Sequence, residues 1–192
     1  MKKIIVLIRE ENDDVRNKYY IDAIKKFGGE VVLVYDSDDI RLVKNKVEEA
    51  DGILLTGGEN IGDLDFYLID YAIKNDIRLL GICLGMQAMS LYGNNSELGM
   101  VGDNSHNNTY HTVRLLSGRL KDIIGDDLIK VNSYHFEKIT DSNNFKTVGI
   151  SDDGIIEAIE NSDHYFQIGV QWHPERIIDS DNSKRLFKSF LN

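Results

Sequence analysis

The first half of the chain alternates short apolar runs with stretches of helical periodicity, and this alternation restricts the fold more than any other feature. The apolar runs are rich in β-branched residues and lie at Lys3–Ile8, Glu30–Tyr35, Gly52–Leu55 and Arg78–Ile82. The spacing between them predicts helices over Val15–Phe27, Ile40–Ala50 and Asp63–Lys74. Strands that alternate with helices are typical of βαβ units, so we expect an α/β fold with a mainly parallel central sheet flanked by helices.

The second half has a different pattern. A fourth helix is expected through Tyr92, and the Gly-, Asn- and Ser-rich segment from Gly93 to Asn108 predicts a loop. Further alternating runs predict strands at Tyr110–Leu115, Leu128–Val131, Lys146–Ile150, Ile155–Ile159 and Phe166–Gln171. We expect these strands to make antiparallel additions to the sheet, followed by a closing helix over Asp181–Leu191.

Length and composition predict one compact domain and exclude two classes of partner. A chain of 192 residues can bury a continuous core, and Pro174 is its only proline, so residues 1–192 are expected to form a single domain. The formal net charge of -10 argues against nucleic acid, whose binding depends on Lys and Arg at the phosphates. No apolar run approaches the roughly 18–20 residues that cross a bilayer. The stretch from Lys2 to Ile8 is also too short for a signal peptide, so we expect no membrane and a cytoplasmic location.

Cys83 is the single cysteine, so it is either a buried small side chain or a reactive thiol. It lies between the apolar run that ends at Ile82 and the next predicted helix, with Gly81 and Gly85 on either side. A tight strand-to-helix turn of this form exposes a nucleophile at the carboxyl end of a sheet. The start of a helix also stabilises a thiolate. This placement favours catalysis over simple packing.

A thiolate that attacks an amide needs a base, and the base needs a third group to orient it. The chain has five histidines, at positions 106, 111, 135, 164 and 173. His173 directly follows the apolar run Ile168–Trp172, where a strand ends and the chain must turn. Glu175 lies two residues further on, close enough to reach the second ring nitrogen of His173. We therefore predict Cys83, His173 and Glu175 as the catalytic residues.

These segments carry a resemblance to a known superfamily. Gly81–Gln87 together with Gly169–Glu175 resembles the paired signature of class I glutamine amidotransferase domains, whose catalytic triad is Cys-His-Glu. Val131–His135 and Asp153–Ala158 resemble motifs of the γ-glutamyl-γ-aminobutyrate hydrolase group, also called peptidase C26. The resemblance implies a flavodoxin-like fold and a hydrolase that cleaves a γ-glutamyl amide.

The same resemblance places further site residues. The oxyanion that forms on attack needs two N–H donors, which we expect from the backbone of Leu84 and of Gly58. Gly58 belongs to a glycine pair after the strand Gly52–Leu55 that resembles the family's oxyanion loop. The residues expected on the substrate side are Gln87, Ser133, Tyr134 and His135. For His111 and His135, a substrate contact and a loop-holding role both remain open.

The sequence also departs from the hydrolase pattern. Leu84 stands where many members have Arg, and Phe136-Glu137 stands where they have His-Gln. The loop Asn60–Asp63 is short and lacks an Arg-Asp dipeptide. The residues Leu84 and Gln87 are more similar to those at the same positions in the glutaminase domains of amidotransferases. The departures fall on the side of the pocket that should hold the amine, so the sequence does not identify that half of the substrate.

Three functions follow as alternatives. The first is a free-standing hydrolase that acts on a small γ-glutamyl molecule through a glutamyl thioester. The second is a glutaminase subunit that delivers ammonia to a synthase partner. The third, a catalytically silent binding or regulatory domain, is disfavoured because no triad position is lost. The sequence leaves open whether the chain forms a homodimer. No cofactor or metal is expected, because the histidines are scattered along the sequence and Cys83 is committed to catalysis.

Overall fold

The computed structural model describes residues 1–9, 14–94 and 96–192. Its strands are β1 (Lys3–Ile8), β2 (Glu30–Tyr35), β3 (Gly52–Leu55), β4 (Arg78–Ile82), β5 (Leu98–Met100), β6 (Asn107–Leu115), β7 (Leu128–Tyr134), β8 (Glu137–Ile139), β9 (Lys146–Ser151), β10 (Ile156–Glu160) and β11 (Gln167–Val170). Its helices are α1 (Asp14–Lys26), α2 (Ile40–Glu48), α3 (Asp63–Lys74), α4 (Leu84–Leu91), α5 (Arg119–Ile124) and α6 (Asp181–Leu191). Within the described ranges, none of these helices has the length and apolar character needed to span a membrane.

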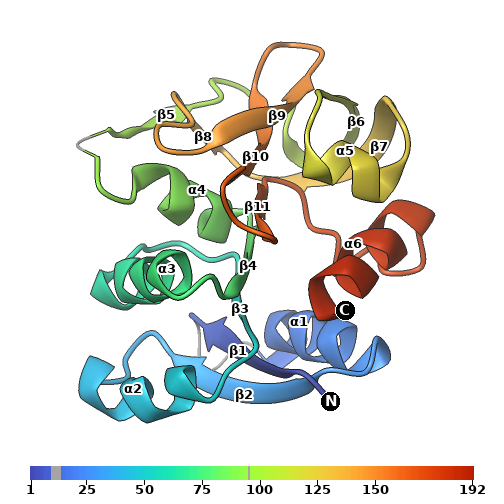
Figure 1. The fold of residues 1–192 in the computed structure, drawn as a ribbon. Helices are drawn as coiled ribbons and strands as arrows, with labels where there is room; N and C mark the ends of the chain where they lie inside the picture. The colour runs from blue at the N-terminus through green and yellow to red at the C-terminus, as the bar shows by residue number, and fades with distance from the viewer. Residues whose placement is uncertain (10–13, 95) are drawn as a thin grey trace.

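A nine-stranded sheet runs through both halves of the molecule in the order β2-β1-β3-β4-β11-β10-β9-β6-β7 (Figure 1). The pairs from β2 to β11 are parallel, and all pairs from β11 to β7 are antiparallel. The strands β5 and β8 pair with each other in a separate two-stranded sheet. The predicted α/β fold, with its flavodoxin-like parallel part and antiparallel additions, is confirmed.

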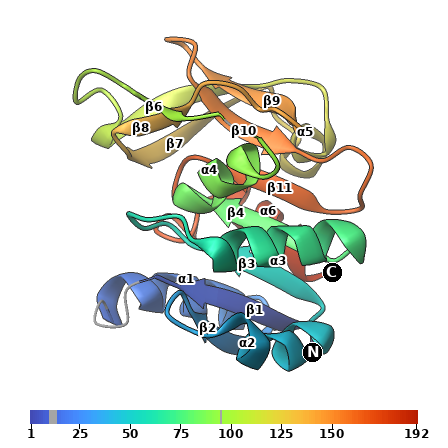
Figure 2. The same cartoon turned by 90° about the vertical axis from the view of Figure 1, so that its left-hand side faces the viewer.

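Helices cover both faces of the parallel part of the sheet. Figure 1 shows α1 and α6 on one side and α2, α3 and α4 on the other, and Figure 2 shows the second group facing the viewer. Each group packs on its own apolar cluster: Ile24 of α1 and Phe187 of α6 belong to one, and Val43 of α2 and Leu68 of α3 belong to the other. The helix α6 has its apolar residues along one stripe, which explains why a terminal segment is helical.

The expected elements of the first half are confirmed, whereas parts of the second half need correction. The four strands β1 to β4 have the predicted bounds, as do α3 and α6. The segment from Gly93 to Asn108 is not only a loop, because it contains β5 and the first residues of β6. The strands β5 and β8 are three residues each and show no periodicity of their own. The helix α5 was missed because a distant carboxylate, that of Glu160, accepts its first N–H groups.

The parallel strands bring three chain segments to one edge of the sheet. In the register of the sheet, Leu55 of β3 lies opposite Gly81 of β4, and Gly81 lies opposite Gly169 of β11. The residues that follow these strands therefore emerge side by side at the carboxyl edge. This edge is where open α/β sheets bind ligands, and it carries Thr56, Cys83 and the segment around His173.

Candidate active site

Cys83 has the backbone of a nucleophile elbow. Its φ of 53° and ψ of -108° lie outside the helical and extended regions, a conformation that costs a non-glycine residue about 1–3 kcal/mol. A Cβ on Gly81 would lie 2.7 Å from the carbonyl carbon of Gly85, and a Cβ on Gly85 would lie 2.8 Å from that of Leu55. Both flanking glycines are thus needed for the turn. The chain holds the strain because a hydrogen bond of 2.8 Å from the N–H of Cys83 to the carbonyl of Val170 fixes the turn to β11.

His173 lies between Cys83 and Glu175. Its Nδ1 is 2.7 Å from Oε1 of Glu175, and its side chain is also hydrogen-bonded to Cys83. Burial alone would lower the pKa of His173, but the charges of Glu175 and Cys83 raise it, to about 9. The imidazole of His173 therefore favours the protonated form. All three predicted triad residues are brought together, each less than one tenth exposed.

Two glutamines that are not part of the predicted triad form a chain of hydrogen bonds to the sulfur of Cys83. Nε2 of Gln171 donates to Sγ of Cys83 at 3.5 Å, and Oε1 of Gln171 accepts from Nε2 of Gln87 at 3.2 Å. A donor beside the sulfur stabilises the thiolate, and Gln87 holds that donor in place. Gln171 was detectable from sequence only as part of the segment before His173. The backbone N–H of His173 is also bonded, at 3.3 Å, to Oδ1 of Asn132.

The two predicted oxyanion donors, Gly58 and Leu84, are both near Cys83. Leu84 begins α4, so its N–H belongs to the free first turn of the helix. The neighbouring Gly57 is already committed, because its N–H donates to the hydroxyl of Tyr20 at 3.1 Å. Burial, followed by the charges of Glu175 and Cys83, raises the pKa of Tyr20 well above its usual value, so its hydroxyl stays neutral. Gly58 lines the same cavity as Cys83, which keeps its N–H the preferred second donor.

Arg9 supports the loop after β3, a role that no sequence pattern indicates. Nε of Arg9 donates to the carbonyl of Thr56 at 2.8 Å, and Nη1 donates to that of Asn60 at 3.1 Å. The rest of the guanidinium forms a two-pronged pair with Asp65, in which both side chains are at most 3% exposed. The pair spans a sequence separation of 56, and only the folded chain shows it. Arg9 thus braces both ends of the glycine loop.

We predict that replacing Arg9 and Asp65 together restores the stability of the fold but not the turnover rate. Arg9→Met should cost about 3–5 kcal/mol of unfolding free energy, because it leaves Asp65 buried without a partner. The matched variant Arg9→Met with Asp65→Leu should recover most of that stability in urea unfolding. Its kcat should still be roughly ten- to a hundredfold below wild type, because the carbonyls of Thr56 and Asn60 lose their anchor. Full recovery of kcat in the double variant would assign the pair a purely structural role.

Two adjoining cavities open at Cys83, and their charges differ. The first is lined by three arginines, Arg9, Arg16 and Arg176, and no carboxylate is among its described lining residues. The second shares Arg16 and Arg176 but also has the carboxylates of Glu59 and Glu137 and the exposed apolar side chains of Met100 and Phe136. Sequence inspection did not locate these cations, which come together only in the fold.

The four predicted substrate-side residues take different positions. Tyr134 lines both cavities, with its ring edge against His173 and the guanidinium of Arg176 4.5 Å from its centre. Gln87 and His135 line the second cavity. Ser133 is fully buried, and its hydroxyl donates to the carbonyl of His106 at 2.7 Å. Tyr134 is therefore the one of the four whose position next to the triad best fits a substrate contact.

The histidines are scattered along the sequence, but the expectation that they are also far apart in the fold is wrong. His106, His111 and His135 gather around the buried carboxylate of Glu157, although 29 positions separate the first from the last. The sequence signal was weak because these side chains come from different segments of the second half. Of the five histidines, His173 is the one that lies beside Glu175 in the predicted triad.

Comparisons with known proteins agree with the fold and with the superfamily that the sequence resembles. The family model described as peptidase C26 matches residues 6–63 and 62–175. A protein of Schizosaccharomyces pombe named as a putative glutamine amidotransferase is 36% identical over 207 residues, which cover 90% of this chain and 80% of that protein. CTP synthase of Bacillus mycoides is 28% identical over 188 residues, which cover 78% of this chain and 35% of that enzyme. The glutaminase domain of Trypanosoma brucei CTPS with bound acivicin has the same fold, with a TM-score of 0.75 at 15% identity over 99% of this chain and 92% of that one.

Proposed function

The chain belongs to the peptidase C26 family, and on that premise we propose that it hydrolyses a γ-glutamyl amide to glutamate and a free amine. The family and its relatives support a cysteine-type hydrolase that acts on a glutamine or glutamyl amide. The observation that carries the finer proposal is that Cys83 and His173 line a cavity together with three arginines, while Glu175 is bonded to His173 behind it.

In the proposed first step, the thiolate of Cys83 attacks the carbonyl carbon of the γ-amide. The carbonyl oxygen becomes an oxyanion that accepts from the N–H groups of Gly58 and Leu84. As this intermediate collapses, the C–N bond breaks and the protonated His173 gives its proton to the departing amine. The product left on the enzyme is a glutamyl thioester of Cys83.

Water completes the reaction. Neutral His173 takes a proton from the water, whose oxygen attacks the thioester carbon, and a second oxyanion forms in the same place. The C–S bond then breaks, glutamate leaves and the thiolate is restored beside the imidazolium. Glu175 keeps the ring of His173 oriented through both steps and supports its positive charge.

The two cavities supply different halves of a substrate site. A glutamyl group carries an α-carboxylate, and the first cavity offers it the guanidinium groups of Arg16 and Arg176. The second cavity begins at Cys83 and reaches the apolar side chains of Met100 and Phe136. We place the amine there, which favours a leaving group larger than ammonia and with apolar character. The short loop from Asn60 to Asp63 agrees with an open mouth on this side.

The alternative is a glutaminase that supplies ammonia to a synthase partner. Its support is the similarity to CTP synthase of Bacillus mycoides and to the glutaminase domain of the Trypanosoma enzyme. The chemistry at Cys83 would be the same. A glutaminase, however, needs a closed route for ammonia to a partner, whereas the second cavity is lined by the exposed side chains of Met100 and Phe136.

A substrate panel tests the proposal. Purified chain is incubated with γ-glutamyl derivatives of aliphatic and aromatic amines, of γ-aminobutyrate, and with glutamine, and released glutamate is measured. We expect kcat/KM for at least one amine to exceed that for glutamine by at least about tenfold, because the apolar amine contacts the second cavity. Phe136→Ala should reduce this advantage and leave the rate on glutamine unchanged. Glutamine as the best substrate, or activity only after a second protein is added, would replace the hydrolase with the glutaminase.

A further inference from the structure

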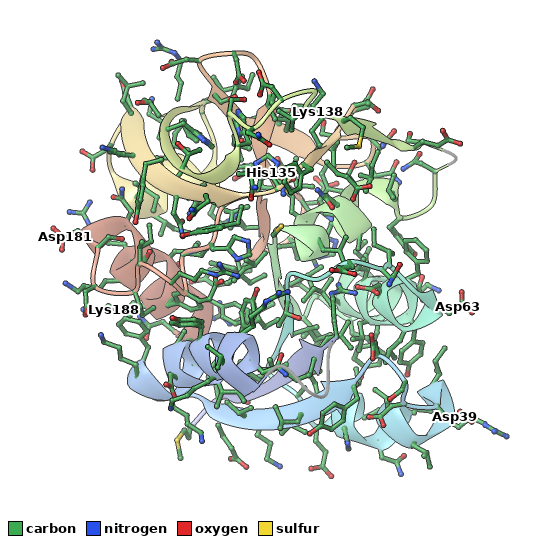
Figure 3. All side chains as sticks on the ribbon, turned by 180° about the vertical axis from the view of Figure 1, so that it is seen from behind. Asp39, Asp63, His135, Lys138, Asp181 and Lys188 are labelled. Atoms are coloured by element: carbon green, nitrogen blue, oxygen red, sulfur yellow. The ribbon has the colours of Figure 1, made fainter. Side chains whose placement is uncertain are left out.

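Four polar side chains that are not part of the triad meet in the second half of the molecule, and one of them, His135, also lines the second cavity. They are His106, which precedes β6, His111 on β6, His135, which follows β7, and Glu157 on β10. Glu157 is completely buried, and His106 and His135 are at most 4% exposed. Figure 3 shows His135 inside the outline of the molecule, whereas the labelled Asp39 and Lys188 lie at its edge. We refer to these four residues as the histidine cluster.

The nitrogens of the histidine cluster converge on one oxygen. Oε1 of Glu157 lies 3.2 Å from Nδ1 of His106, 3.3 Å from Nε2 of His111 and 3.5 Å from Nε2 of His135. The nitrogens of His106 and His135 are 3.2 Å apart. Neighbouring ligand atoms of a tetrahedral zinc ion, with bonds of about 2.0–2.1 Å, are about 3.4 Å apart. The spacing of the cluster matches that of a metal's ligand shell.

Outer partners fix the protons of two of these rings. Nδ1 of His135 lies 2.9 Å from the carbonyl oxygen of Glu137, which can only accept, so this nitrogen carries the proton. Nε2 of His106 lies 3.0 Å from a carboxylate oxygen of Asp153 and carries its proton for the same reason. The inward nitrogen of His135, Nε2, is therefore free to act as a ligand, and Nδ1 of His106 is free in the same way when that ring is neutral. Such outer hydrogen bonds are the usual support of metal-ligating histidines.

With neutral imidazole rings, the buried carboxylate of Glu157 has no positive charge beside it in the described part of the chain. Nδ1 of His106 and Nε2 of His135 lie 3.2 Å apart, so with the ring protons on the outer nitrogens two lone pairs would meet there. Both oxygens of Glu157 are buried, and among the described residues neither has a partner with hydrogen-bond geometry. A buried carboxylate without such compensation costs several kcal/mol. A cation in the middle would satisfy the carboxylate and the lone pairs together.

We propose that the histidine cluster binds one divalent transition metal ion, with Zn²⁺ as the best fit. Imidazole nitrogens and a carboxylate oxygen suit this ion, and the candidate ligand atoms of His106, His111 and Glu157 all lie within 4.8 Å of one another. We assign His135 as the fourth ligand, because its Nε2 lies 3.2 Å from Nδ1 of His106 and 3.5 Å from Oε1 of Glu157. Four protein ligands leave no open position for substrate, so the ion would be structural. It would join β6 and β10 to the end of β7, next to Tyr134, and it does not depend on the proposed hydrolysis.

The metal alone is the probe, and the parent protein is Cys83→Ala so that the catalytic thiolate cannot bind it. After treatment with a chelator and dialysis, Zn²⁺ is titrated and counted by elemental analysis. We expect one ion per chain with submicromolar affinity and a melting temperature raised by several degrees. Co²⁺ at the same site should give the visible absorption of a tetrahedral nitrogen and oxygen site without a thiolate band.

Two variants locate the ion. Glu157→Gln and His111→Asn should each weaken Zn²⁺ binding by at least about a hundredfold. His164→Asn is the matched control: this histidine pairs with Asp76 elsewhere, and its loss should leave the affinity unchanged. Glu157 is buried, so circular dichroism must show that Glu157→Gln folds. If it does not fold, His111→Asn alone tests the site, because the side chain of His111 is 15% exposed and its replacement disturbs the core less. The proposal is overturned if neither Zn²⁺ nor Co²⁺ binds stoichiometrically to the parent, or if binding survives His111→Asn.

Discussion

Replacing Cys83 with alanine is expected to lower kcat by at least about ten-thousandfold, the size of loss seen when a covalent nucleophile is removed. Only the thiolate can form the thioester, and no second cysteine can take over. Cys83→Ser should be almost as inactive, because a hydroxyl is much harder to deprotonate than a thiol. Glutamate release from the best γ-glutamyl amine is the measurement.

The fold should survive this change, since alanine has a smaller side chain than cysteine. Circular dichroism and thermal unfolding should be close to wild type. Ser90→Ala on the same helix is the matched control: its hydroxyl bonds to the carbonyl of Asp141, and its turnover should stay near wild type. An alkylating agent should label wild type once and Cys83→Ala not at all. If the alanine variant kept more than about a hundredth of the activity, the nucleophile would have to be sought elsewhere.

The elements nearest to Cys83 were predictable because their signals are local. The strand β4 is a continuous apolar run, and the glycines at positions 81 and 85 mark a turn that larger side chains would block. His173 and Glu175 are two positions apart, so one extended segment fixes their contact. When residues are this close in the sequence, the local backbone conformation alone sets their relative positions. The candidate triad could therefore be proposed before any contact was known.

The supports of the site were not predictable, because they depend on long-range contacts. Arg9 reaches Asp65 across 56 positions, and Gln171 reaches Cys83 across 88. No spacing rule connects such residues. The same holds for His106 and Glu157, which come within 3.2 Å of each other because β10 and β6, the strand that begins directly after His106, both pair with β9 in one sheet. A buried arginine after a strand and a glutamate inside one are ambiguous until the sheet order is known.

His173→Asn is expected to be nearly as damaging as loss of Cys83, at about a thousandfold or more in kcat, because asparagine can neither accept nor deliver the proton. Two residues that act as a unit do not give additive losses. The double variant of Cys83→Ala with His173→Asn should therefore be no worse than the more damaged single variant. Additive losses, measured as kcat on the same substrate, would mean that the two side chains act separately.

Glu175→Gln should be milder in rate but should change the pH dependence. Glu175 is among the causes that raise the pKa of His173 to about 9, so in wild type the imidazolium persists at neutral pH and is lost as the pH rises through about 9. Glutamine has the same shape as glutamate but no charge. Burial, which lowers the pKa of His173, is then no longer opposed by the charge of Glu175. The alkaline limb of the kcat profile should move toward neutral pH. A profile that keeps its alkaline limb near 9 in Glu175→Gln would show that the limb belongs to another group and that Glu175 does not set the charge of His173.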